Sequence, residues 1–264
     1  MKKTIYNKFD KKAITGLPQV TFPGRIISII SPGETQKAVD YLLSSDILGV
    51  DTETKPAFHK GEHHQVSLLQ VSNRDTCFLF RLNLTGITPA IKQLLEDTTV
   101  KKVGLSWHDD LRGLEAREPF QPGLFIDLQD VVPTLGIEDL SLQKLFANLF
   151  HQKISKRQRL SNWEAPLLDT KQRQYAAIDA WSCILLYEEI LRLKETQEYE
   201  LIRVPEPEEP APKIASEEGK KKTKKKQKEA SIKYFTYGLM TACETNGMMT
   251  VRGINGMMTV SGSN

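Results

Sequence analysis

A long helix that is apolar on most of its sides constrains the fold of this chain more than any other feature of the sequence. It is expected at about residues 169–196, and the side chains around Tyr175 and Asp179 are apolar: Ala176, Ala177, Ile178, Ala180, Trp181, Ile184 and Leu185. Such a helix is buried against other layers of secondary structure. Tyr175 and Asp179 are four residues apart, so they lie on one face of it. Because burying a lone charge is costly, Asp179 needs a partner, for which an arginine or the Tyr175 hydroxyl would suffice.

Alternating strand and helix patterns indicate the layers around that helix. Strands are expected at residues 25–30, 47–52, 65–72, 77–82 and 102–107, with a turn at 73–75. A helix start at residues 31–34 leads into a helical pattern through residue 43, and further helices are expected at 87–96 and 108–117. A meander of strands followed by alternating strands and helices predicts an α/β fold built on a mixed sheet.

The 264 residues divide into four parts by composition. Residues 1–23 are an N-terminal extension, and residues 24–200 form the globular domain. Residues 201–230 combine a Pro/Glu linker with a run of seven lysines in ten residues, from 219 to 228, which is expected to be disordered. Residues 231–264 form a tail of unknown structure, in which the sequence of residues 246–251 recurs at 255–260.

Composition excludes several classes of protein. The hydrophobic content of 39% comes without a run long enough to span a membrane, and the basic N-terminus lacks the apolar stretch of a secretory signal. The three cysteines, Cys77, Cys183 and Cys243, have no metal-like spacing and give no disulfide framework. We therefore expect a cytoplasmic protein without membrane contact.

Two further acidic motifs accompany Asp179. Asp51 and Glu53 follow an apolar strand and point to the same face, where two ionised groups about 5 Å apart would repel by roughly 3 kcal/mol at an effective dielectric near 20. Water at a frayed strand end would relieve that repulsion, as would a bound cation. Asp109 and Asp110 lie at an expected helix start, where acids also act as ordinary caps.

The acidic motifs make a coherent site if they converge. Asp51, Glu53, Asp110 and Asp179 would bring a formal charge of −4 into one cleft, which two divalent cations would neutralise. Hard oxygen ligands suit Mg²⁺ or Mn²⁺. Two such ions about 4 Å apart can clamp the attacking and leaving oxygens of a phosphoryl displacement.

In their order and spacing, Asp51-x-Glu53, Asp110 and Tyr175-x-x-x-Asp179 resemble the three motifs of the DEDD superfamily of 3′–5′ exonucleases, in its tyrosine-bearing branch. The similarity is to the exonuclease domain of the Werner-syndrome helicase and, more distantly, to ribonuclease D. It continues through residues 60–70, 101–104, 140–145 and 161–163, and covers about residues 24–195.

This resemblance implies a ribonuclease-H-like fold, with a five-stranded mixed sheet flanked by helices, and removal of mononucleotides from the 3′ end of a nucleic acid. It also implies that Asp51 bridges two divalent cations, Mg²⁺ or Mn²⁺, while Glu53 and Asp179 hold the ion beside the nucleophile. Asp110 would then anchor the second ion, and Tyr175 would orient the attacking water. His108, beside the second motif, is interpreted as a local structural residue.

Basic and aromatic residues near the motifs are candidates for contacts with nucleic acid. They lie in a loop after the first motif and in the connection to the third: Lys55, Phe58, His59 and Lys60, then Lys156, Arg157 and Arg159. A plain surface loop and a solvated face remain alternatives. The lysine run is expected either to add non-specific, salt-sensitive affinity for nucleic acid or to serve as solubilising sequence. The local group His59, Glu62, His63 and His64 has no nearby cysteine, so a zinc site is disfavoured. Trp163 and Trp181 are interpreted as core residues.

The leading hypothesis is a metal-dependent 3′–5′ exonuclease, with DNA slightly favoured over RNA. A catalytically silent nucleic-acid-binding module and an endonuclease of the wider ribonuclease-H-like group are the alternatives. The sequence has no Gly-x-x-x-x-Gly-Lys-Ser/Thr phosphate loop, so no ATP-dependent activity is expected.

Overall fold

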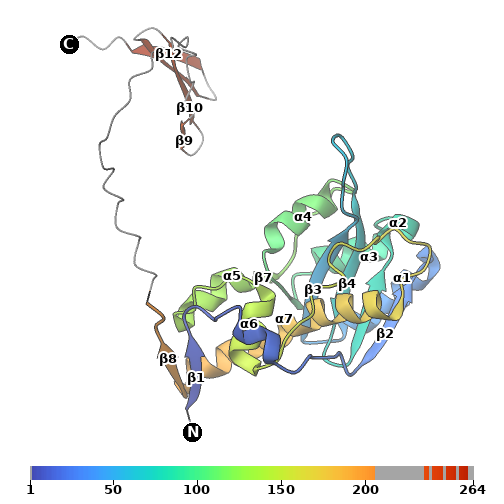
Figure 1. Cartoon of the computed structure of the whole chain (residues 1–264). Helices are drawn as coiled ribbons and strands as arrows, with labels where there is room; N and C mark the ends of the chain where they lie inside the picture. The colour runs from blue at the N-terminus through green and yellow to red at the C-terminus, as the bar shows by residue number, and fades with distance from the viewer. Residues whose placement is uncertain (1, 206–234, 238–239, 246–247, 254–255, 261–264) are drawn as a thin grey trace, which may run out of the picture. The chain divides into compact units, whose positions relative to one another are not determined.

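The computed structural model describes residues 2–205, 235–237, 240–245, 248–253 and 256–260 (Figure 1). The chain forms two units, residues 1–207 and 208–264. The expected linker and lysine run lie almost wholly outside the described residues. Within the described part of the chain, no helix is both long and apolar enough to cross a membrane.

A mixed sheet of six strands forms the centre of the first unit, in the order β2-β5-β4-β3-β6-β7 (Figure 1). Its strands are β2 (Arg25–Ile29), β3 (Ile47–Thr54), β4 (Val66–Ser72), β5 (Thr76–Phe80), β6 (Lys101–Gly104) and β7 (Phe125–Asp127). Strands β3, β4 and β5 pair antiparallel, whereas the β2–β5, β3–β6 and β6–β7 pairs are parallel. The predicted α/β fold on a mixed sheet is confirmed, but the sheet has six strands where five were expected.

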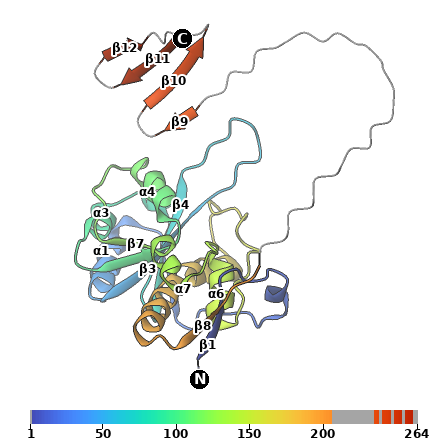
Figure 2. The same ribbon diagram turned by 90° about the vertical axis from the view of Figure 1, so that its left-hand side faces the viewer.

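Helices cover both faces of this sheet, as the view in Figure 2 shows. One face carries α7 (Thr170–Thr196), with α5 (Leu128–Val131), α6 (Leu142–Phe150) and the 3₁₀ turn η2 (Val132–Leu135) nearby. The other carries α1 (Pro32–Leu43) and α3 (Pro89–Glu96), next to the short α2 (Leu82–Thr85) and to α4 (Trp107–Glu115).

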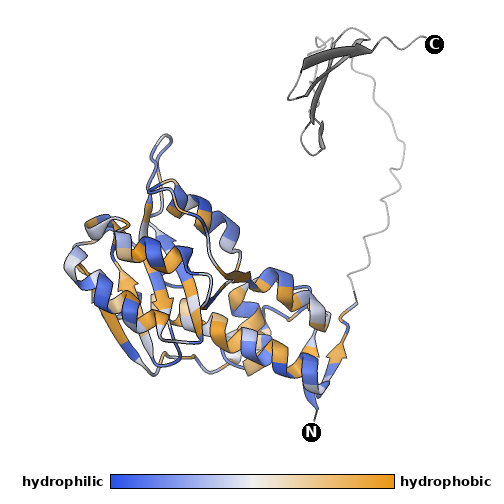
Figure 3. Cartoon of the chain, turned by 180° about the vertical axis from the view of Figure 1, so that it is seen from behind, coloured by the Kyte–Doolittle hydropathy of each residue, from blue (hydrophilic) through white to orange (hydrophobic). Residues whose placement is uncertain are grey.

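The alternation of side chains along the central strands produces two separate cores. In β4, Leu68 packs with the α7 side, whereas Leu69 and Val71 pack with the α1 and α3 side. Every residue of β4 is buried, because layers lie on both of its faces. Figure 3 shows apolar residues along the strands, with hydrophilic residues on outer helical surfaces. The buried long helix that the sequence predicted is α7.

The N-terminal segment packs on the domain through a second, two-stranded sheet. Strand β1 (Lys3–Tyr6) pairs in parallel with β8 (Tyr199–Ile202), and the 3₁₀ turn η1 (Ala13–Gly16) follows. The buried side chain of Asn148 holds the strand: its Oδ1 accepts from the Tyr6 amide at 2.9 Å and its Nδ2 donates to the Tyr6 carbonyl at 2.7 Å. The expected boundary between residues 23 and 24 therefore coincides with no division of the structure, because these residues belong to the same unit.

The described part of the second unit is an antiparallel sheet in the order β12-β11-β10-β9. Its strands are β9 (Phe235–Tyr237), β10 (Met240–Thr245), β11 (Met248–Gly253) and β12 (Gly256–Val260). The repeated sequence accounts for two of them, because one copy provides most of β11 and the other provides β12, which pair with each other.

Candidate active site

Three carboxylates meet where strand β3 emerges from the core. The strand is buried over its first four residues and becomes partly exposed at Asp51, so Asp51 and Glu53 lie at the edge of the domain. Helix α7 brings Asp179 to the same point. One carboxylate oxygen from each of the three residues lies within 4.8 Å of the others. The carboxylates from motifs that are more than 120 residues apart therefore form one acidic cluster.

Gly49 allows α7 to approach β3 this closely. A Cβ at Gly49 would lie 1.9 Å from the carbonyl oxygen of Ala180 and 2.8 Å from its carbonyl carbon, so no larger residue fits. Ala180 is the neighbour of Asp179, and the missing side chain thus lets the helix backbone contact the strand backbone two residues before Asp51. The sequence analysis did not single out this glycine, although a glycine inside an apolar strand signals close approach of another backbone.

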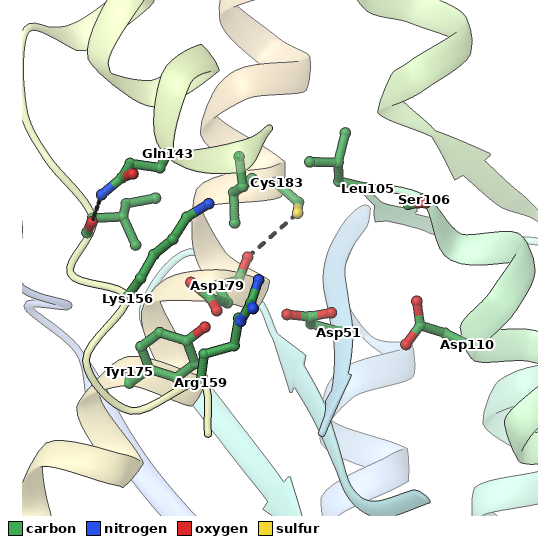
Figure 4. A pocket seen from close by; sticks show the side chains of 12 residues that line it. Asp51, Leu105, Ser106, Asp110, Gln143, Lys156, Arg159, Tyr175, Asp179 and Cys183 are labelled. Carbon is green, nitrogen blue, oxygen red and sulfur yellow. Dashed lines mark hydrogen bonds between the residues drawn. The ribbon is translucent and has the colours of Figure 1, made fainter. Parts of the chain in front are cut away.

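Asp110, from the first turn of α4, lies beside the cluster. The Thr52 hydroxyl donates a hydrogen bond to its carboxylate. Asp51 and Asp110 line the same hollow of about 520 Å³, but Asp110 is not part of the 4.8 Å group. Figure 4 shows Asp51 between Asp179 on one side and Asp110 on the other. The remaining lining residues are Leu105, Ser106, Leu142, Gln143, Ile154, Lys156, Arg159, Tyr175 and Cys183.

Asp127, which the sequence analysis missed, fixes the start of the helix that carries Asp110. Its buried carboxylate accepts from the amides of Ser106 at 2.9 Å and Trp107 at 2.7 Å. Ser106 adopts a left-handed conformation with φ 61°, which ends β6 earlier than expected and turns the chain directly into α4. The ring of His108 is largely exposed, with its Nδ1 3.3 Å from Asp127 Oδ2, in keeping with a local structural role.

Burial and mutual repulsion raise the pKa values of the acidic cluster. Burial raises the pKa of Glu53 to about 9, with further contributions from the charges of Asp179 and Asp110. The pKa of Asp51 rises well above its usual value, first through burial and then through the same neighbours. Burial raises the pKa of Asp179 to about 7 even though a hydrogen bond from Tyr175 opposes the shift. A cluster that resists ionisation by itself, and offers only hard oxygen donors, fits a divalent cation.

Tyr175 forms one wall of the hollow and is held there by aromatic packing. Its ring lies 6.0 Å from that of Trp163, which is fully buried, as expected for a core residue. Trp181, the other predicted core aromatic, packs edge-on against Phe22 at 5.6 Å. Burial raises the pKa of the Tyr175 hydroxyl, and the charges of Asp179 and Glu53 raise it further. The hydroxyl is therefore protonated at neutral pH.

Two predicted basic residues face the acidic cluster. Lys156 and Arg159 line the hollow, and Figure 4 shows the Arg159 side chain reaching toward Asp179 and Asp51, while Lys156 Nζ donates to Ser141 Oγ at 3.3 Å. The charge of Arg159 lowers the pKa of Glu53. Burial lowers the pKa of Lys156, and repulsion by Arg159 adds to that effect. Arg157 does not line this hollow but lines a separate one, which shares Tyr175 with the first.

The other predicted contact residues lie in the loop after β3. The side chain of Phe58 is 71% exposed, and His59 and Lys60 are exposed as well. Lys55 pairs with Glu164 at 3.5 Å, and this pair links the loop to the connection that precedes α7.

His64 adds a second link between these two segments. Its Nε2 lies 2.7 Å from Glu62 and its Nδ1 lies 3.3 Å from Glu164. Among the described residues, the three metal-ligating groups that come together are Asp51, Glu53 and Asp179, and this histidine group is not among them.

Comparison with known sequences decides the family. The family described as 3′-5′ exonuclease matches residues 28–194, which include all of the acidic motifs. The chain belongs to the 3′-5′ exonuclease family. The resemblance to DEDD exonucleases is thereby confirmed, and so is the expectation of an exonuclease-type hydrolase at the level of the family.

Relatives in the 3′-5′ exonuclease family include the bifunctional 3′-5′ exonuclease/ATP-dependent helicase WRN of Mus musculus, 27% identical over 194 residues. The exonuclease 3′-5′ domain-containing protein 2 of Drosophila melanogaster is 34% identical over 150 residues. The alignments cover 68% and 55% of this chain, but only 14% and 25% of those two relatives. A 3′-5′ exonuclease of Arabidopsis thaliana is 29% identical over 202 residues, which cover 70% of each chain.

Solved structures show the same fold at low sequence identity. The EXO domain of Aedes aegypti Nibbler superposes with a TM-score of 0.61 at 20% identity, over 68% of this chain and 95% of that one. Escherichia coli RNase D superposes with a TM-score of 0.58 at 17% identity, over 66% of this chain and 45% of that one. The ribonuclease-H-like fold expected from the sequence is therefore confirmed.

Proposed function

We propose that this chain is a metal-dependent 3′–5′ exonuclease that hydrolyses phosphodiester bonds from a free 3′ end of a nucleic acid. The observation that supports this most directly is the convergence of Asp51, Glu53 and Asp179 within 4.8 Å, beside a hollow that Asp110 and Tyr175 also line. An acidic cluster of this kind would repel a polyanion, so it favours phosphate chemistry only with cations bound.

The donor set fits two divalent cations, Mg²⁺ or Mn²⁺. Asp51 lies between Asp179 and Asp110, which makes it the ligand that two ions could share (Figure 4). Glu53 and Asp179 would complete one site, and Asp110 would belong to the other. When bound, the cations stabilise the charge of the phosphoryl transition state and lower the pKa of water.

The side chains of the chain then have separate tasks. Because the pKa of Tyr175 is raised, its hydroxyl stays protonated and can hold and orient the attacking water, but it cannot act as the base. Thr52 holds the Asp110 carboxylate in place through its hydrogen bond. Lys156 and Arg159 can neutralise phosphate oxygens that enter the hollow, where Arg159 presents a planar fork of donors.

DNA is the favoured polymer in this proposal, because the segments between the motifs resemble the Werner-type exonuclease domain. RNA is the alternative, and it finds support in structural neighbours such as Escherichia coli RNase D, which is described as an exoribonuclease. The 2′-hydroxyl is the group by which a protein distinguishes the two.

The test is degradation of matched end-labelled DNA and RNA, single-stranded and recessed, in Mg²⁺, Mn²⁺ or EDTA. The proposal expects a ladder of single-nucleotide steps from the 3′ end that EDTA abolishes. Bound but uncut substrate would indicate a silent binding module, and cleavage of a closed circle would indicate an endonuclease.

Adjacent aspartates provide a matched pair of variants for the same assay. Asp110→Asn removes a proposed ligand, and we expect activity to be lost without loss of stability, because like-charge repulsion falls. Asp109→Asn changes the next residue, whose exposed side chain pairs with Arg112 at 3.3 Å, and should leave activity unchanged. Equal activity of the two variants would contradict the assignment of Asp110.

A further inference from the structure

A second hollow shares Tyr175 with the hollow beside the acidic cluster. It measures about 260 Å³, and its walls come from the N-terminal segment, the connection before α7 and the first turns of α7. The lining residues are Gln19, Ser155, Arg157, Gln158, Lys171, Gln174, Tyr175 and Ile178. Because Tyr175 lines both hollows, this space is the direct neighbour of the proposed catalytic site.

The second hollow carries only positive charge, whereas the first combines three aspartates with two basic side chains. Arg157 and Lys171 contribute two cations, and none of the described residues that line it is acidic. Both side chains are exposed, and neither forms an ion pair within the described part of the chain. Uncompensated cations in a concave site attract an anion.

Two glutamines of the walls are held in place by hydrogen bonds to neighbouring residues. Gln174 Oε1 accepts from the Phe22 amide at 3.1 Å, and its Nε2 donates to the Phe22 carbonyl at 3.4 Å. Gln158 Oε1 accepts from the Ser161 hydroxyl at 2.7 Å, an arrangement that leaves its amide NH₂ as a donor. Gln158 thus adds an amide donor to the two cations that line the hollow.

We propose that this second hollow, the Arg157–Lys171 pocket, binds a phosphate group of a nucleotide. The arginine can bond two phosphate oxygens at once, and the lysine adds a point charge. At about 260 Å³ the pocket is smaller than a site for a whole drug-sized ligand, and it suits a phosphate with part of a sugar. Only the choice of a nucleotide phosphate as the ligand rests on the proposed function; anion binding by this pocket does not.

Two sources can supply that phosphate group. One is a phosphodiester of the substrate strand, and the other is the 5′-phosphate of the mononucleotide released by hydrolysis. Two probes distinguish them: a nucleoside 5′-monophosphate, and a short single-stranded oligonucleotide without a 5′-phosphate.

The experiment measures binding of both probes by calorimetry in EDTA, to the full chain and to the double variant Arg157→Gln/Lys171→Gln. Without cations the acidic cluster contributes nothing favourable, so the result is independent of whether the protein is a nuclease. Loss of two charge-assisted contacts should weaken binding of at least one probe by about tenfold or more, and lower its salt dependence. The probe affected identifies the source.

A control variant loses the same formal charge elsewhere. Lys101→Gln/Lys194→Gln replaces two exposed lysines that line neither hollow, and it should bind both probes like the unaltered chain. The proposal is overturned if the Arg157/Lys171 variant binds both probes as the unaltered chain does. It is equally overturned if the control variant loses as much affinity, because the effect would then be one of net charge.

Discussion

Replacing Gly49 by alanine should separate the two elements that form the acidic cluster. The added Cβ would lie 1.9 Å from the Ala180 carbonyl oxygen, whereas ordinary contacts begin at 3.4 Å, so the backbones must move apart by about 1.5 Å. Ile184, whose Cγ1 would lie 3.0 Å from the new atom, blocks an easy sideways shift of the helix. The displaced segment of α7 includes Asp179, and the expected effect is therefore on the site as well as on packing.

The magnitude follows from the size of that displacement. Overpacking a dense interior costs about 1–3 kcal/mol in the free energy of unfolding. A misplacement of roughly 1 Å in a catalytic group can cost about 100-fold in rate, so the loss in kcat of Gly49→Ala should be at least of that order. The rate should fall much more than substrate affinity, because the substrate contacts proposed for Lys156 and Arg159 lie outside the strand–helix contact.

Single-turnover cleavage in saturating Mn²⁺ and thermal unfolding measure the two effects separately. Gly33→Ala is the matched control, because a Cβ there has no atom within 4 Å and the residue lies in α1. It should keep the rate of the unaltered chain, with a melting temperature equal or slightly higher. A folded Gly49→Ala protein with an unaltered cleavage rate would refute the reasoning, since α7 would then not need its present distance from β3.

Three further predictions concern charge and capping. Without cations the folded state holds protons on Asp179, with a pKa of about 7, and on Glu53, with a pKa of about 9, more tightly than the unfolded chain does. The contribution of these two groups to stability in EDTA is therefore highest below about pH 4, and it falls as the pH rises through the two raised pKa values. Mg²⁺ should raise the melting temperature more at pH 8.5 than at pH 5.5. An equal rise at the two pH values would contradict this prediction. Asp127→Ala leaves two amides at the start of α4 without an acceptor. We expect the free energy of unfolding in urea to fall by about 2–4 kcal/mol, and cleavage to slow because Asp110 on the same helix is displaced. Activity at the level of the unaltered chain would count against this prediction. Burial lowers the pKa of Lys102 to about 8, below its value in the unfolded chain, so stability should rise between about pH 8 and 10, and Lys102→Met should remove that rise in unfolding titrations.

The fold was readable from the sequence wherever elements are long enough to show a period. Residues 47–52 and 169–196 were expected as strand and helix, and the structure has β3 at Ile47–Thr54 and α7 at Thr170–Thr196. Strand β7 has three residues, too few for a pattern of alternation, and no strand was expected in that region. The expected number of five strands was therefore one too low, because a strand as short as β7 has no recognisable pattern.

The acidic residues of the candidate site could be predicted from the sequence, but the residues that position them could not. Asp179 could be noticed in the sequence because a carboxylate is unexpected in an otherwise apolar helix. Nothing in the sequence distinguishes Asp127, because its partners are the backbone amides of Ser106 and Trp107, about 20 residues earlier. Lys171 could not be singled out either, because one lysine on an exposed helical turn forms no pattern. Only the structure shows that it lines the same hollow as Arg157.

The β1–β8 pair determines how the first unit would respond to mechanical tension. The two strands run in the same direction with Lys3 opposite Tyr199 and Tyr6 opposite Ile202, so the chain enters at one end of the pair and leaves at the other. Force applied at residues 2 and 205 would pull the strands past each other lengthwise. Their interstrand hydrogen bonds would then bear the load together and break at once, whereas the opposite orientation would let them open one by one. A domain tethered at both of its ends would thus remain closed until this strand pair ruptures.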